Sequence, residues 1–285
     1  MAHPERAGNP PPREPLRLLA VLAHPDDESL GFGGVLAKYA AEGVETSLVT
    51  ATRGEGGRFR EHREGPEHPG RARLGEIREA ELHAAAKALG IGEVSILGYP
   101  DGRLDQINPR EILPALVRHI RRVRPQVVLT FSPDGSYGHP DHIAICQLTT
   151  AAVVASADAA FDGTERAGGP HAVSKLYYLV SSPERMAAYQ EAFKKLTSVV
   201  DGVERSANPW PEWEITTSVE TSAHVETVWK AIFCHDSQVS VFEKLRTLDP
   251  AHHEVLWGRQ ELYRAMSTVN GGRSRETDLF EGLRP

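Results

Sequence analysis

The sequence predicts an α/β protein with a doubly wound, mainly parallel sheet. Short apolar runs alternate with amphipathic stretches through the first half of the 285-residue chain, which is typical of strands joined by crossover helices. Two of the apolar runs are followed at once by loops rich in His and Asp. Open α/β sheets bind their ligands at the carboxyl ends of strands, so we expect the functional residues in these two loops.

Four strands and four helices are predicted between residues 16 and 155, and together they form a Rossmann-like half. The predicted strands are nearly continuous apolar runs, as expected for strands covered on both faces, and they span 16–23, 44–52, 94–98 and 127–131. The predicted helices have apolar residues at helical spacing and span 33–42, 71–89, a segment that begins at 108–109, and 143–155. Between them lie a long charged loop, 53–70, and a shorter loop, 132–139.

The second half of the chain is less regular. It has a predicted strand at 175–180, a second one at 213–217, a helix at 223–234, and loops at 162–170 and 201–211. We expect residues 16–285 to form a single domain in which 156–285 is a C-terminal elaboration that helps to wall the pocket. Residues 1–15 are polar and proline-rich, and we expect a disordered tail there.

Composition excludes several classes of protein. The net charge of −7 is not the basic excess of a nucleic-acid-binding protein, and no apolar stretch approaches the length of a membrane span. The two cysteines, Cys146 and Cys234, are too few for a disulfide framework and suit reduced thiols in the cytoplasm. We therefore expect a cytoplasmic protein with a small-molecule partner, no nucleic acid and no membrane; a homo-oligomer is left open.

Two motifs supply chemistry at the strand ends. His24-Pro25-Asp26-Asp27-Glu28 follows the first strand, and Tyr137-Gly138-His139-Pro140-Asp141-His142 follows the strand at 127–131. Either motif by itself could be only a turn, because Pro fixes φ and Asp bonds its own backbone. A catalytic zinc site takes three N or O ligands and keeps one position open, and His24, Asp27 and His142 meet that need.

A nucleotide site is the alternative at the first motif. Gly31-Phe32-Gly33 opens a helix after the first strand, as a dinucleotide fingerprint would, but the position of its third glycine holds Leu36. We therefore interpret these glycines as allowing close packing of the helix start, which disfavours a nicotinamide-dependent oxidoreductase.

The paired motifs resemble those of the LmbE/PIG-L family of metal-dependent N-deacetylases. This family includes the deacetylases of N-acetylglucosaminyl-inositol in mycothiol synthesis, their bacillithiol counterparts, and mycothiol-conjugate amidase. The resemblance depends on residues 23–28 and 139–142, is supported by 97–102 and 235–238, and covers about residues 16–240.

The resemblance implies a metal centre and a general base. His24, Asp27 and His142 would bind Zn²⁺, although Fe²⁺ and Co²⁺ fit the same ligands. Asp26 would be the general base that deprotonates the metal-bound water. The implied function is removal of an N-acetyl group from a glucosamine-type sugar derivative. An amidase acting on a larger thiol conjugate is the alternative within this chemistry, and a noncatalytic sugar- or metal-binding protein is the alternative outside it.

The resemblance also implies roles around the metal. His139 would be an electrostatic stabiliser or general acid with Asp141 holding its ring, and Tyr137 would add a hydrogen bond to the oxyanion. Arg78 and Asp101 would contact the substrate, although a surface ion pair is the alternative for Arg78 because it lies among helical glutamates.

Three features are left open by the residues alone. Glu28 could support a ligand or cap the following helix, and His235 could reach the pocket or simply pack. The loop 53–70 is a candidate lid or specificity loop.

Overall fold

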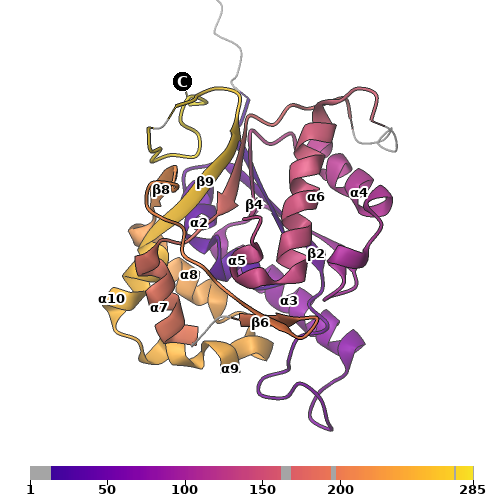
Figure 1. The fold of residues 1–285 in the computed structure, drawn as a ribbon, viewed down its shortest axis with the longest axis vertical. Helices are drawn as coiled ribbons and strands as arrows, with labels where there is room; N and C mark the ends of the chain where they lie inside the picture. Colours follow the sequence, from indigo (N-terminus) through magenta and orange to yellow (C-terminus); the bar gives the residue numbers. More distant parts are fainter. Residues whose placement is uncertain (1–13, 162–167, 194–196, 273, 285) are drawn as a thin grey trace, which may run out of the picture.

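The computed structural model describes residues 14–161, 168–193, 197–272 and 274–284, and a central sheet dominates this part of the chain (Figure 1). The predicted tail at 1–15 lies almost wholly outside the described residues. The strands are β1 (Arg17–Leu22), β2 (Glu45–Thr52), β3 (Glu93–Tyr99), β4 (Val127–Phe131), β5 (Lys175–Leu179), β6 (Thr197–Val200), β7 (Val203–Ser206), β8 (Thr217–Glu220) and β9 (Arg259–Ser267).

Seven of these strands form one sheet, in the order β3-β2-β1-β4-β5-β9-β8. The first five strands of the chain run parallel, whereas β9 runs antiparallel to both of its neighbours. The strand order reverses between β1 and β4, and such a reversal is where open α/β sheets bind ligands. The prediction of a doubly wound, mainly parallel sheet is confirmed.

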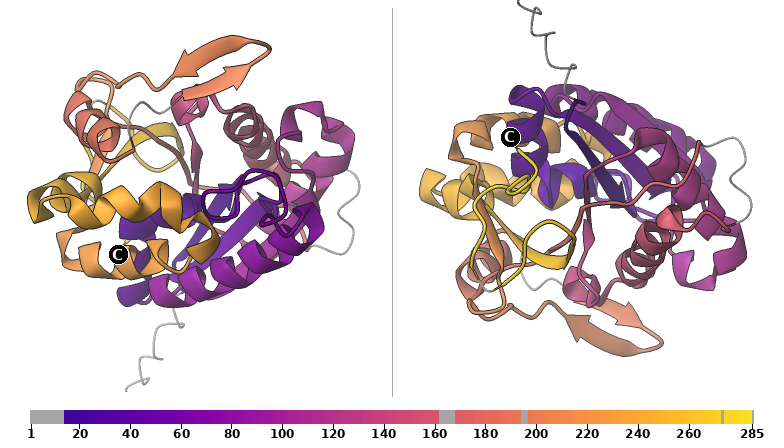
Figure 2. Two further views of the ribbon diagram at one scale, coloured as in Figure 1. Left: turned by 90° about the horizontal axis from the view of Figure 1, so that it is seen from below. Right: turned by 90° about the horizontal axis from the view of Figure 1, so that it is seen from above.

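Helices cover both faces of the sheet (Figure 2). One face carries α2 and α3 packed against α8, and the other carries α4 packed against α6, as right-handed crossovers require. The helices are α1 (Asp27–Leu30), α2 (Gly33–Ala41), α3 (Arg71–Leu89), α4 (Pro109–Val123), α5 (Gly135–Gly138), α6 (Pro140–Ala157), α7 (Pro183–Phe193), α8 (Val225–Ile232), α9 (Val239–Phe242) and α10 (Pro250–His253). Short 3-10 or π turns occur at Leu104–Gln106, Ser222–His224, Asp236–Gln238, Glu243–Thr247 and Glu254–Gly258.

Helix α6 begins three residues before the predicted start at 143. The His139 side chain caps it by accepting the backbone N–H of Asp141, and Pro140 occupies its first turn, where a missing N–H costs nothing. His142 is therefore held by a helix rather than by a loop. This matters because a helical backbone fixes the direction of a side chain more firmly than a loop does.

Two predictions in the second half are wrong. Residues 213–217 were expected to be a strand, but successive turns follow Pro211, Trp213 is 81% exposed, and β8 begins only at Thr217. The loop expected at 201–211 contains β7, which pairs with β6 in a separate hairpin. Six of the nine residues of the loop expected at 162–170 lie outside the described residues.

The glycines at the start of α2 allow two elements to pack closely. A Cβ on Gly33 would lie 3.0 Å from Val228 on α8, and one on Gly34 would lie 2.8 Å from the Thr221 hydroxyl. The start of α2 is thus pressed against the C-terminal half of the chain.

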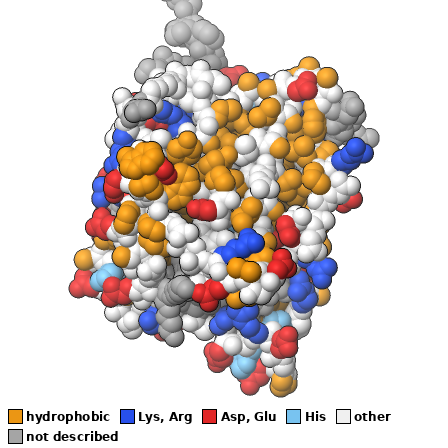
Figure 3. Space-filling model, viewed as in Figure 1, with side chains coloured by type: hydrophobic (Ala, Val, Ile, Leu, Met, Phe, Trp, Pro, Cys, Tyr) orange, Lys and Arg blue, Asp and Glu red, His pale blue; other side chains and the backbone are white. Residues whose placement is uncertain are grey.

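The surface is apolar over part of the face seen in Figure 1. Figure 3 shows hydrophobic side chains gathered over the upper part of this face, where α6 and β9 lie, and charged side chains toward its lower end. Val154 on α6 is 67% exposed. Among the described residues, no helix is both long and apolar enough to cross a membrane.

Candidate active site

Three side chains converge at the carboxyl ends of β1 and β4, at the switch point of the sheet. His142 Nε2 lies 3.3 Å from His24 Nδ1 and 3.4 Å from Asp27 Oδ1, and His24 Nδ1 lies 3.6 Å from Asp27 Oδ2. All three residues are buried. The structure thus brings together the three residues predicted to be metal ligands, although they come from two motifs more than 100 positions apart.

The other nitrogen of His24 faces two more carboxylates. His24 Nε2 lies 3.1 Å from Asp141 Oδ2 and 3.1 Å from Asp101 Oδ1, so this nitrogen donates to the two carboxylates while Nδ1 faces Asp27 and His142. Burial would lower the pKa of His24, but hydrogen bonds to Asp101, Asp141 and Asp27 outweigh it and raise that pKa well above its usual value. The three carboxylates around His24 therefore favour a positive charge on its ring or beside it.

The donor set fits a divalent metal ion. Two imidazole nitrogens and a carboxylate are the ligands that zinc-type ions take in catalytic sites, and a carboxylate behind one of the histidines is the usual outer support. Burial would raise the pKa of Asp27, but the nearby His142 lowers it well below the usual value, so the carboxylate is ionised and ready to bind a cation.

A second group of possible ligands, His24, His139 and Asp141, also lies within reach of one ion. The Asp141 carboxylate is less available for a metal, however. It already accepts hydrogen bonds from the backbone N–H groups of Gly102 (2.7 Å) and Leu104 (2.9 Å), besides contacting His24. The first group, His24, Asp27 and His142, therefore has the side chains more available to a metal ion.

Asp141 was expected to hold the ring of His139, and it contacts that ring through its backbone. Its carboxylate contacts His24 instead. Only the backbone N–H of Asp141 reaches His139, donating to Nδ1 at 3.2 Å. The reason is helical: His139 is the N-cap of α6 and Asp141 lies in its first turn, so the cap bond uses the main chain while the Asp141 side chain turns toward β1.

The ring of His142 is held by stacking. Phe131, the last residue of β4, lies parallel to it with ring centroids 3.8 Å apart and an interplanar angle of 9°. Within the described residues, His142 Nδ1 is buried and has no hydrogen-bond partner. The orientation of this ligand therefore depends on the helix and on the aromatic ring.

Asp26 lies beside the donor set in a strained backbone conformation. Its φ is 107°, in the left-handed region that residues other than glycine rarely adopt. Its carboxylate accepts a hydrogen bond from Arg78 Nη2 at 3.0 Å. Burial raises the pKa of Asp26 to about 6, and the Arg78 charge opposes that rise.

Glu28 and His235 form a buried pair beneath Asp26. Glu28 Oε2 accepts the backbone N–H of Asp26 at 3.0 Å, and Glu28 Oε1 lies 2.7 Å from His235 Nε2. Neither side chain is exposed to solvent. The pKa of Glu28 is lowered, because the nearby His235 outweighs the effect of burial. The pKa of His235 is raised, because the nearby Glu28 outweighs the effect of burial there. The charged pair thus supports the backbone of Asp26.

Arg78 and Asp101 form hydrogen bonds and ion pairs with other residues of the protein. The Arg78 guanidinium donates to the carbonyl oxygens of Gly54 and Pro25 as well as to Asp26, and its side chain is 5% exposed. It is therefore not the surface ion pair that was the alternative. Asp101 accepts the Gly56 N–H at 2.7 Å and contacts His24. Substrate contact by either residue stays a prediction.

The loop 53–70 is joined to this network at its base. A Cβ on Gly54 would lie 2.1 Å from Arg78 Nη1, so glycine is needed where the loop wraps around the guanidinium. Farther along, Gln238 donates to the carbonyl oxygen of Arg58 at 2.7 Å. Through Asp101 the loop lies near His24, as a lid or specificity loop requires; that role stays a prediction.

His139 and Tyr137 border the donor set. The His139 ring lies with its centroid 4.9 Å from that of His24, and burial lowers the pKa of His139 to about 3. Because Nδ1 accepts a hydrogen bond, the neutral ring carries its proton on Nε2. Tyr137 lies edge-on to His142, with ring centroids 5.4 Å apart, and burial raises the pKa of its hydroxyl.

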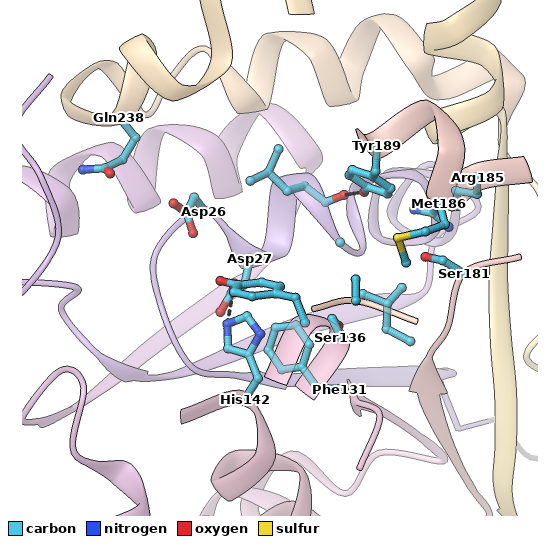
Figure 4. Close-up of a pocket in the computed structure, with 15 residues that line it drawn as sticks. Asp26, Asp27, Phe131, Ser136, His142, Ser181, Arg185, Met186, Tyr189 and Gln238 are labelled. Carbon is cyan, nitrogen blue, oxygen red and sulfur yellow. Dashed lines mark hydrogen bonds and ion pairs between the residues drawn. The ribbon is translucent and has the colours of Figure 1, made fainter. Parts of the chain in front are cut away.

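A cavity of about 230 Å³ opens beside these residues (Figure 4). Part of its wall was predicted from the sequence: Asp26, Asp27, Tyr137 and His142. The rest was not, and much of it comes from the exit of β5 and from α7, as Ser181, Arg185, Met186 and Tyr189. A signal for these residues was present, because β5 is a parallel strand and its carboxyl end had to reach the same edge of the sheet.

Comparisons with known proteins agree with this geometry. Residues 19–153 match the family model described as PIG-L: GlcNAc-PI de-N-acetylase. The chain is 35% identical to a 1D-myo-inositol 2-acetamido-2-deoxy-alpha-D-glucopyranoside deacetylase from Kineococcus radiotolerans, over 95% of this chain and 84% of the relative.

Solved structures share the fold. The N,N'-diacetylchitobiose deacetylase of Pyrococcus horikoshii has a TM-score of 0.64 at 23% identity, over 87% of this chain and 83% of that one. A 4-carboxy-2-hydroxymuconate hydratase from Pseudomonas putida has a TM-score of 0.65 at 21% identity, over 90% and 99%. The fold by itself therefore does not define the reaction. The sequence similarity to the inositol-sugar deacetylases does define the family, and the chain belongs to the PIG-L/LmbE family of N-deacetylases.

Proposed function

We propose that the chain hydrolyses the N-acetyl group of a glucosamine-type sugar derivative, with a divalent metal ion held by His24, Asp27 and His142. The observation that carries the proposal is the convergence of these three residues, two of which, Asp27 and His142, line one cavity together with Asp26. The relatives act on N-acetylglucosaminyl-inositol by name, and this supports an amino sugar linked to a polyol as the first substrate to test.

The bound metal would polarise the amide carbonyl and lower the pKa of a water molecule beside it. Asp26 would accept the proton of the attacking water, because it lines the cavity next to the donor set. Arg78 would hold the Asp26 carboxylate in place through the Nη2 hydrogen bond, so that little reorganisation is needed as the proton moves.

His139 and Tyr137 would stabilise the negative charge that develops on the carbonyl oxygen. The neutral His139 ring offers its Nε2–H, and the Tyr137 hydroxyl, which burial keeps protonated, offers a second donor. The leaving amine needs one proton, and Asp26 can return the one that it received. This assignment favours His139 as stabiliser over general acid, because its Nδ1 already accepts the cap hydrogen bond.

A test of this function measures amine release on defined metal forms. Protein freed of metal with a chelator is reloaded with Zn²⁺, Fe²⁺ or Co²⁺ and given N-acetylglucosaminyl-inositol, simple N-acetylglucosaminides and a thiol-conjugate amide. We expect no release from the metal-free protein and restored release after reloading. Release only from the thiol conjugate would make the chain an amidase. A metal-loaded protein that binds the sugars but releases no amine would be a binding protein, contrary to the proposal.

Replacing Glu28 with glutamine is expected to lower kcat about 10- to 100-fold while the metal stays bound. The substitution removes the charge that pairs with His235 and weakens the acceptor for the Asp26 N–H, so the strained backbone of the base loses its support. Kinetics and metal content are measured together. Glu79→Gln is the matched control, because Glu79 pairs with Arg53 at the surface. An unchanged kcat, or a fall that follows metal content, would refute this positioning role.

A further inference from the structure

The end of the cavity away from the metal ligands contains a buried arginine. Arg185, in the first turns of α7, is 2% exposed and lines the same cavity as Asp26 and His142. Figure 4 shows Arg185 with Met186 and Tyr189 at one end of the cavity, and Asp26, Asp27 and His142 at the other. The buried arginine and the proposed metal ligands thus lie at opposite ends of one cavity.

The Arg185 guanidinium lacks the partners that a buried cation normally has. In the part of the chain that the structure describes, Nε and Nη1 are buried without a hydrogen-bond partner, and no carboxylate forms an ion pair with the side chain. Its recorded contact is with the Tyr189 ring, whose centroid lies 5.6 Å from Cζ. Arg78, by contrast, is equally buried and donates to three acceptors. An unpaired buried charge is costly, which indicates that a ligand completes the site.

The surroundings of Arg185 indicate the chemistry of that ligand. The cavity wall between Arg185 and the metal ligands is mainly apolar, with Leu30, Phe131, Leu179 and Met186. In such surroundings a guanidinium favours a planar or tetrahedral anion that accepts two parallel N–H bonds, that is, a carboxylate or a phosphate.

A second cavity lies on the other side of Arg185. It has a volume of about 300 Å³ and is lined by Glu184, Glu220, Glu254 and Glu261. Among the described residues none of these carboxylates bonds to Nε or Nη1 of Arg185.

Helix α7 is tied to the catalytic motif. The Tyr189 hydroxyl donates to the carbonyl oxygen of Leu30, at the end of the helix that begins with Asp27, over 2.8 Å. Arg185 is one turn before Tyr189 on the same helix, so its distance from the metal ligands is fixed by the fold. A ligand group bound at Arg185 would therefore set the position of the amide.

We propose that Arg185 forms a subsite for an anionic group, carboxylate or phosphate, on the part of the substrate that is linked to the amino sugar. The proposal rests on the proposed deacetylase function and specifies its substrate: an N-acetylated amino sugar whose aglycone carries apolar surface and one negative charge.

Matched substrates test the subsite. Phenyl, 4-carboxyphenyl and 4-phosphophenyl N-acetylglucosaminides differ only in the charge at the end of the aglycone, and kcat and KM are measured for each. We expect KM to be about 10- to 100-fold lower for at least one charged substrate than for the phenyl one, as for a charged hydrogen bond formed in a buried site. The carboxylate and phosphate arms show which anion is preferred.

Variants connect the preference to the residue. In Arg185→Gln the KM of the phenyl substrate divided by that of the charged substrate is expected to fall to about 1. Arg185→Lys should keep part of this KM ratio, because lysine keeps the positive charge but cannot donate two parallel hydrogen bonds. Arg259→Gln, an exposed arginine on β9, is the matched control and should keep the full ratio. A ratio near 1 in the wild-type protein, or a ratio that persists in Arg185→Gln, would overturn the proposal.

Binding separates this inference from the proposed function. If none of the substrates releases amine, the deacetylase proposal fails, and affinity for the phenyl and 4-carboxyphenyl glucosaminides is then measured directly. Tighter binding of the charged compound, lost in Arg185→Gln, would support the subsite without turnover; equal binding would reject it.

Discussion

Replacing Asp26 with asparagine is expected to lower kcat about 10²- to 10⁴-fold with little change in metal content. Asparagine keeps the size of the side chain and can still accept the Arg78 hydrogen bond, but it cannot take a proton from water. The loss should therefore appear in the chemical step. Amine release under saturating substrate, together with metal analysis of the purified variant, measures both quantities.

The adjacent aspartate provides the matched control. Asp27→Asn makes the same chemical change one residue away, but there it removes charge from the ligand that faces both His24 and His142. We expect this variant to lose metal affinity, and excess metal should restore part of its activity. A metal-replete Asp26→Asn protein that deacetylates at the wild-type rate would show that another group is the base. Rescue of Asp26→Asn by excess metal would show that Asp26 is a ligand.

The parallel half of the fold could be predicted because each element depends on local pattern. Predicted and observed bounds coincide for the helix at Arg71–Leu89 and the strand at Val127–Phe131, where apolar periodicity and terminal glycine or proline agree. The meeting of His24 and His142 could also be predicted, because parallel strands deliver their exits to one edge of the sheet.

The other features of the fold and of the site depend on contacts between distant residues, which the local sequence pattern does not indicate. From the sequence, Arg78 on α3 could be a solvated surface ion pair. In the structure the glycine-rich loop after β2 covers its guanidinium, which donates a hydrogen bond to Asp26. The direction of β5 indicated that the segment after it reaches the site, but the lack of hydrogen-bond partners for Arg185 Nε and Nη1 is visible only in the structure. The antiparallel strands β9 and β8 joined the sheet through long-range pairing that the mixed polar sequence did not indicate.

The C-terminal strands are held by a buried charge network around Glu276. Its Oε1 lies 2.7 Å from Lys175 Nζ and 2.9 Å from Arg264 Nη1, and its Oε2 accepts hydrogen bonds from the hydroxyls of Tyr177 and Thr217. Glu276 is 1% exposed and Lys175 is not exposed. The network joins β5, β9 and β8 to the terminal segment, and β5 leads directly into the wall of the active-site cavity.

Replacing Glu276 with glutamine is expected to lower the free energy of unfolding by about 3–5 kcal/mol, since it leaves two buried cations without a counter-charge. Denaturant unfolding at neutral pH measures the loss. Glu212→Gln is the matched control, because Glu212 pairs with Arg275 at the surface with 66% of its side chain exposed. That change should cost less than about 1 kcal/mol. A Glu276→Gln protein as stable as the control would mean that the network adds nothing to stability.

The same network predicts how stability depends on pH. Burial would raise the pKa of Glu276, but hydrogen bonds from Lys175, Asn270 and Tyr177 outweigh it and lower the pKa from 4.5 to about 2. A carboxylate with a depressed pKa stabilises the fold fully above its unfolded value, and this stability is lost as the pH falls through the folded value. The stability gap between wild type and Glu276→Gln should therefore be constant above about pH 5 and shrink steadily toward pH 2. A gap that stayed constant across this range would mean that the glutamine disrupts packing rather than charge, because only the charge titrates there.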